Sequence, residues 1–128
     1  MGQPAARQGD LIVASDTHVV RVMGVTMAMT FPFNGVISGG LSQNVRIAGR
    51  PAATTGSTAI NTPPHTPERG TFQRPPSNRG RIVGGSTTVF INGRPAARVG
   101  DAAMTCNDPA DRPVGKVVAK DRVTVFVG

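Results

Sequence analysis

The apolar residues of this chain fall into short runs that are separated by turn-forming residues. Residues 88–91 and 123–127 are rich in β-branched and aromatic side chains, which favour extended strands. Two glycines at 84–85 give the backbone freedom before the first run, and Asn92-Gly93 follows it with residues that tolerate positive φ. This pattern predicts many short strands joined by tight turns, because glycine and proline spread so evenly would destabilise helices.

One short phrase recurs three times among these runs. Its copies lie within residues 3–10, 49–57 and 93–101 and read Pro-Ala-Ala-Arg or Pro-Ala-Ala-Thr, followed two residues later by glycine. Proline fixes φ and cannot donate to a ladder, so it favours a strand edge or a corner. The two alanines are small enough for neighbouring walls to approach closely. The phrase therefore predicts a repeated corner.

Each phrase belongs to a larger unit that contains two short strands. Residues 35–48 and 80–92 each precede a phrase, whereas residues 115–128 resemble them but are followed by none. The first phrase, in turn, has no such segment before it. Joined end to end, the first and last fragments would make a third unit. The sequence therefore predicts a closed, three-sided body in which the two ends of the chain meet.

Two regions interrupt the repeat, within what the length predicts to be a single domain over residues 1–128. Residues 19–33 are apolar and contain Met23, Met27 and Met29, and we predict an irregular apolar strand there. Residues 62–80 contain five prolines together with arginines, and we predict an exposed loop.

The net charge of +7 changes the list of partners to consider. A basic chain of this size could bind nucleic acid or an acidic membrane surface. Arg69, Arg74, Arg79 and Arg81 gather in one loop, but Phe72 is the only aromatic residue beside them. A solvated loop explains this cluster better than a surface that reads nucleic acid.

The N-terminal sequence contains no secretory signal, because no basic region precedes an apolar core. We therefore expect synthesis in the cytoplasm and, if the protein acts outside, export by another route. The apolar stretch at 19–33 is too short to span a bilayer and is interrupted by Arg21 and Pro32.

All the soft metal ligands of the chain follow the repeated phrase. His18 and His65 lie nine residues after Gly9 and Gly56, and Cys106 lies six residues after Gly100. Three equivalent loops would bring these side chains to a common point, which predicts one metal ion near a pseudo-threefold axis. Zinc accepts such imidazole and thiolate donors. The alternative is two surface histidines and an ordinary buried cysteine.

The fourth ligand stays open. Asp16, Asp108, Asn107, a backbone group and water are the candidates, and either aspartate could instead orient an imidazole from the second layer. No catalytic residue is predicted, because no glutamate or further histidine stands ready as a general base. Glu68, the only glutamate, lies in the proline-rich loop. Cys106 also lacks the surroundings of a nucleophile, so we do not expect an enzyme.

Residues 86–101 resemble the PAAR-repeat family, and weaker copies of the motif extend this resemblance over most of the chain. The resemblance implies an all-β fold: a small, pseudo-threefold cone of short β-strands and tight turns, metal-stabilised at its apex. Family members usually hold one structural zinc ion with three histidines and one cysteine. Here His18, His65 and Cys106 fit that set, but a third histidine is missing, which leaves open the fourth ligand and whether the metal is zinc or iron.

The same resemblance implies a function. It implies a structural tip that caps and sharpens the trimeric β-helical spike, of valine-glycine-repeat type, of a contractile injection or secretion apparatus. Such a tip would bind as a monomer to a threefold partner, touch the target membrane transiently and be delivered outside the cell. Because the repeat fills the chain, we expect no fused effector. A basic nucleic-acid-binding module is the alternative function, and a metal-dependent hydrolase is third.

Overall fold

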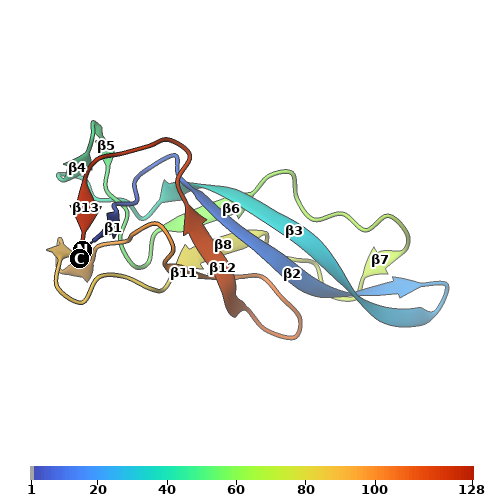
Figure 1. Ribbon diagram of the computed structural model, residues 1–128. Helices are drawn as coiled ribbons and strands as arrows, with labels where there is room; N and C mark the ends of the chain where they lie inside the picture. Colours follow the sequence, from blue (N-terminus) through green and yellow to red (C-terminus); the bar gives the residue numbers. More distant parts are fainter. Residues whose placement is uncertain (1) are drawn as a thin grey trace.

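Every regular element in residues 2–128, the part that the computed structural model describes, is a β-strand (Figure 1). This confirms the all-β prediction. No helix among these residues has the length and apolarity needed to cross a bilayer. The strands are β1 (Gln3–Pro4), β2 (Leu11–Val22), β3 (Val25–Gly39), β4 (Arg46–Ile47), β5 (Arg50–Pro51), β6 (Thr58–Asn61), β7 (Thr71–Phe72), β8 (Arg79–Ile82), β9 (Phe90–Ile91), β10 (Arg94–Pro95), β11 (Ala102–Thr105), β12 (Arg112–Val118) and β13 (Phe126–Val127).

Six of these strands close into a small antiparallel barrel. Their order is β12–β11–β8–β6–β3–β2, and β12 then pairs with β2 through Val117 and Ile12. Closure leaves no unpaired edge in this part of the sheet. The interior is filled by small and medium apolar side chains around one aromatic ring, that of Phe33.

The barrel consists of three similar units, as the repeat predicts. Each phrase leads into one barrel strand (β2, β6 or β11), and a second strand (β3, β8 or β12) returns to a two-stranded hairpin. Two of these short hairpins are local, β4–β5 and β9–β10. The third is formed by the two ends of the chain, where β1 pairs with β13 and Gln3 lies opposite Val127. The predicted meeting of the first and last segments is therefore confirmed.

The three phrases meet in a ring of hydrogen bonds that carries the pseudo-threefold symmetry. The amide of Ala6 donates to the carbonyl of Ala97, Ala97 donates to Ala53, and Ala53 donates to Ala6, each at 3.0 Å. All three alanines are buried. A larger side chain at these positions would push the backbones apart, which explains why small residues recur there.

A tight turn follows each alanine pair and starts the next barrel strand. The glycines at 9, 56 and 100 have φ of 93°, 93° and 95°, a region that other residues rarely adopt. The side chain after each glycine accepts a hydrogen bond from the amide three residues earlier; these pairs are Asp10 with Arg7, Ser57 with Thr54, and Asp101 with Arg98. The three turns therefore have the same backbone conformation and the same side-chain hydrogen bond.

The predicted irregular strand at residues 19–33 is wrong, because these residues complete a long and regular hairpin. β2 and β3 pair without a register shift from Leu11↔Val36 to Val22↔Val25. Met23 and Gly24 form the turn with φ of 50° and 80°, which suits the right-handed twist of a two-residue hairpin. The hairpin projects from the barrel at the end away from the three short hairpins (Figure 1), and Met23 at its tip is 97% exposed.

The predicted exposed loop at residues 62–80 is partly wrong. It folds back along the long hairpin, where β7 pairs with β2 through Phe72 and Val20, and its last residues begin β8. His65 within it is buried. Arg74 binds the carboxylate of Asp108, so it is not one of four equivalent solvent-exposed arginines.

Candidate metal centre

Four potential metal ligands converge at the end of the barrel away from the alanine ring. Asp16 and His18 lie on β2, His65 lies in the loop after β6, and Cys106 follows β11. One donor atom from each lies within 4.8 Å of every other, and all four residues are buried. Each repeat unit therefore contributes at least one donor to the cluster.

Asp16 lies at the centre of these contacts. Its Oδ2 is 2.7 Å from Nε2 of His65 and accepts a hydrogen bond from Sγ of Cys106 at 3.5 Å, while Oδ1 accepts one from the hydroxyl of Thr105. Its side chain is fully buried. None of these partners is a lysine or an arginine, and a buried carboxylate is costly unless a cation pairs with it. The site therefore favours a bound cation.

His18 is the least satisfied polar side chain of the cluster. It is 1% exposed, and neither ring nitrogen has a hydrogen-bond partner among residues 2–128. Burial lowers the pKa of His18, and the proximity of His65 adds to this, whereas the carboxylates of Asp108 and Asp16 oppose it. The lowered pKa favours the neutral imidazole, which has a lone pair to offer a metal ion. A metal ion would satisfy this otherwise costly group.

Cys106 is an ordinary thiol as long as no metal binds. Burial, and next the negative charge of Asp16, raise the pKa of the Cys106 thiol to about 11. A metal ion that takes this sulfur must displace the proton, so binding would release it.

Three phenylalanines enclose the two imidazoles. The ring of His18 lies 5.7 Å from that of Phe72 and 6.0 Å from that of Phe31, and the ring of His65 lies 5.5 Å from Phe31 and 6.1 Å from Phe33. This apolar shell lowers the local dielectric, which strengthens metal–ligand electrostatics.

Asparagines fix the orientation of His65. Nδ2 of Asn61 lies 3.1 Å from Nδ1 of the imidazole, and Oδ1 of Asn61 accepts the amide of Asn34. The side chain of Asn78 accepts the backbone amide of His65 at 2.8 Å. Nε2 of the ring consequently points at Asp16.

Asp108, the other candidate carboxylate, lies one layer outside the four donors. Its Oδ2 accepts the amide of Val19 at 2.8 Å and lies 3.6 Å from Nδ1 of His18, while Oδ1 binds the guanidinium of Arg74. Burial alone would raise the pKa of Asp108, but the Val19 amide and Arg74 outweigh it and hold the pKa below its usual range. Asp108 therefore joins the 62–80 segment to the cluster.

The three residues predicted from the repeat, His18, His65 and Cys106, are brought together. Of the side chains left open for the fourth place, the cluster includes Asp16. The amide of Asn107 is used elsewhere, since it accepts Thr17 N–H and donates to Thr105 O.

Sequence reasoning missed two supporting residues, Asn61 and Thr105. Both lie five residues after the glycine of their phrase, the third counterpart being Ala14. Alignment of the three units would have marked this as a shared inward position. The unequal spacing of Cys106 has a local reason: Thr105 and Cys106 are adjacent and both buried, so strand alternation ends there.

This donor set suits a closed structural site. Two imidazole nitrogens, one thiolate sulfur and one carboxylate oxygen are the ligand types of tetrahedral zinc, and such an ion would satisfy one of the two unpartnered nitrogens of His18. The four residues come from three segments far apart in the sequence, so an ion here would cross-link the three units.

Comparison with known proteins gives one finding. The family model of the PAAR motif matches residues 72–128, which include the third phrase, Cys106 and the last half-unit. This match confirms the predicted resemblance. No curated protein matches the sequence.

Proposed function

We propose that the protein caps and sharpens the trimeric β-helical spike of a contractile injection apparatus. The match of residues 72–128 to the family model of the PAAR motif supports this, because that motif is associated with spike-tip proteins of such systems. The observation that supports it most is the pseudo-threefold base, formed by the three short hairpins. A single chain with this symmetry matches the end of a threefold partner. One monomer would sit on one spike and aid membrane puncture, with transient contact at the target membrane.

The base presents apolar side chains at two of three equivalent places. Phe90 and Phe126 lie opposite Pro95 and Pro4 in their hairpins and are 58% and 59% exposed, and Arg46 takes the third equivalent place. Beneath them, a separate apolar cluster includes Ile47, Ile91 and Val127, one from each hairpin. Exposed aromatic residues on a well-packed platform are typical of protein-binding surfaces.

The opposite end suits a narrow, stiff point. We propose that His18, His65, Cys106 and Asp16 hold one structural zinc ion. When bound, the ion would supply a cross-link between the three units at this end, as the alanine ring does near the base. Such a site contributes directly to folding free energy, which a barrel this small could not obtain from its core alone.

The base proposal is tested with Phe90→Ala and Phe126→Ala. Burial of each ring should contribute about 1.5–3 kcal/mol, so we expect each variant to weaken binding to a valine-glycine-repeat spike trimer by at least about tenfold. Ile60→Ala is the matched control, because Ile60 is equally exposed (58%) but lies on the barrel wall. Binding is measured by biolayer interferometry. No complex with the wild-type protein, or equal loss with Ile60→Ala, contradicts the proposal.

The fourth ligand is tested by comparing Asp16→Asn with Asp108→Asn. Loss of a direct ligand should lower zinc affinity by more than about 100-fold, whereas loss of an outer partner should lower it by about tenfold. Affinity is measured by competition with a chromophoric chelator, and Co²⁺ absorption reports the coordination geometry. Equal effects of the two variants would argue against Asp16 as a ligand.

A further inference from the structure

Three equivalent clefts lie between neighbouring units at the base, and side chains of residues 2–128 fill only two of them. Each cleft lies beside the fourth residue of a phrase, counted from its proline. This residue is Arg7 in the first phrase, Thr54 in the second and Arg98 in the third. The three residues have equivalent backbone surroundings, since each takes part in one of the isolated bridges that join the phrases.

Arg7 and Arg98 fill their clefts in the same way. Nη1 of Arg7 donates to the carbonyl of Ala48 at 3.0 Å, and Nη1 of Arg98 donates to the carbonyl of Gly128 at 3.3 Å. Ala48 and Gly128 are equivalent, because each directly follows the first strand of its short hairpin, β4 or β13. Further acceptors complete the two sites: the carbonyl of Ile47 for Arg7, and the carbonyl of Gly85 and the carboxylate of Asp101 for Arg98.

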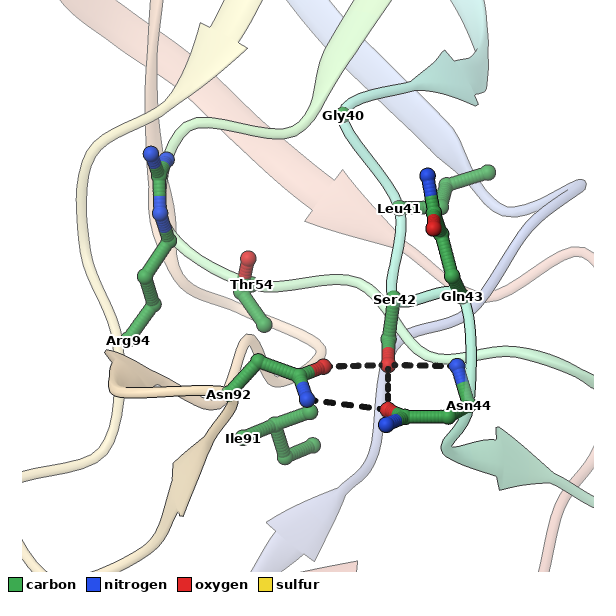
Figure 2. Close-up of a pocket in the computed structure, with 9 residues that line it drawn as sticks. All are labelled: Gly40, Leu41, Ser42, Gln43, Asn44, Thr54, Ile91, Asn92 and Arg94. Carbon is green, nitrogen blue, oxygen red and sulfur yellow. Dashed lines mark hydrogen bonds between the residues drawn. The ribbon is translucent and has the colours of Figure 1, made fainter.

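The third cleft is open. Asn92, which follows β9, takes the place of Ala48 and Gly128, but Thr54 is too short to reach it. A cavity of about 430 Å³ remains between them. Figure 2 shows Thr54 among the lining residues, with Ser42, Asn44 and Asn92 joined by hydrogen bonds on one side and Arg94 on the other.

The charges around this cleft differ from those of the filled ones in a consistent way. Where the arginine is missing, the aspartate of the following turn is missing too, since Ser57 stands where the other units have Asp10 and Asp101. The remaining acceptors are neutral carbonyl, hydroxyl and amide oxygens. Two arginines share the equivalent site in another unit, because the counterpart of Arg94, Arg50, packs over Gly9 in the unit that contains Arg7; there the carboxylate of Asp121 lies 4.0 Å from Arg7.

We infer that the cleft beside Thr54 binds a guanidinium group supplied from outside the chain. The group would occupy the place that Arg7 and Arg98 occupy in the other two clefts and donate to oxygens at Asn92 and in the 40–44 segment. A planar, forked donor can bond to several acceptors at once, as Arg7 and Arg98 do in their clefts, which the compact ammonium of lysine does less well. The guanidinium could belong to an arginine of a bound protein or to a free compound. The inference does not depend on the spike proposal, because it follows from internal symmetry alone.

The test is an amide NMR titration of the wild-type protein. Ethylguanidinium and N-acetyl-arginine methylamide are the two probes, and butylammonium is the control cation. We expect saturable shifts confined to residues 40–44, 54–55 and 91–94 with both guanidinium probes, and no saturation with butylammonium. At least tenfold tighter binding of the arginine derivative would assign the site to a protein chain, and equal affinity would assign it to a free compound. Absence of saturation with either probe overturns the inference.

Thr54→Arg supplies the missing group within the chain. We expect this variant to abolish the guanidinium shifts and to raise the thermal midpoint by about 2–4 °C. Thr26→Arg on the exposed part of β3 adds the same charge far from the cleft and should do neither. If Thr54→Arg does not fold, Thr54→Gln fills part of the cleft and should still weaken the titration. Unchanged guanidinium shifts in a folded Thr54 variant that fills the cleft would overturn the inference.

Discussion

Removal of the metal is expected to lower the thermal midpoint of this protein by more than about 10 °C, which corresponds to a loss of several kcal/mol. The physical reason lies in what the metal would leave behind. The carboxylate of Asp16 would remain buried without a permanent cation, and the His18 nitrogen that the ion would bind would be left without a partner. Three chain segments would also lose their common cross-link. Differential scanning calorimetry before and after chelation, with zinc added back, measures the effect.

Cys106→Ser separates loss of the ion from other effects of the chelator. This variant should start from a lower midpoint and should respond little to chelation, because it keeps the shape of the side chain but loses the thiolate. Met104→Ser serves as the control that keeps the full response, because Met104 lies on β11 two residues before Cys106 and outside the donor cluster. A wild-type protein that carries no stoichiometric metal by elemental analysis, or whose midpoint is unmoved by chelation, would contradict the zinc proposal.

Phe33→Ala is expected to cost about 3–5 kcal/mol, the second largest effect. Phe33 is 1% exposed and is the only aromatic side chain in the barrel core. Its ring also touches the metal end, 6.1 Å from the ring of His65. A glycine packs against this ring, because a Cβ on Gly80 would lie only 3.1 Å from it. The walls are therefore shaped to this ring and cannot easily collapse into the space that it would leave.

Urea unfolding at saturating zinc measures this cost, and Phe90→Ala provides the comparison. Phe90 is largely exposed on the base, so its truncation should change the free energy of unfolding by less than about 1 kcal/mol. If the two variants were equally stable, the barrel would have to repack around the missing ring, and the assigned role of Phe33 as the core filler would be wrong.

The sequence predicted the symmetry of the fold better than its individual strands. The repeated phrase, and the half-units at residues 3–10 and 115–128, were sufficient to predict three sides and the meeting of the two ends. The long β2–β3 hairpin was missed because Met23-Gly24 is not a typical turn pair, although both residues adopt positive φ. The prolines and arginines of the 62–80 segment favour a solvated loop. Its docking depends on contacts distant in sequence, such as Phe72 with Val20.

The sequence predicts the residues that could bind the metal, but it does not predict the residues that surround them. Repeat position identified His18, His65 and Cys106, and the spacing of Asp16 two residues before His18 puts both on one face of a strand. Which of two aspartates joins the cluster depends on Arg74 and Val19, which bind Asp108 instead. No local sequence pattern indicates that Arg74 and Val19 bind Asp108.

The closure of the barrel has a consequence for how the protein is made. The strand that completes it pairs residues 116–118 with residues 11–13, so almost the whole chain lies between the two partners. The alanine ring likewise needs all three phrases at once. During translation the barrel therefore cannot close until its last strands leave the ribosome, although the local β2–β3 hairpin can pair earlier. Such non-local pairing makes folding slow and all-or-none, and it makes the nascent chain dependent on protection from aggregation.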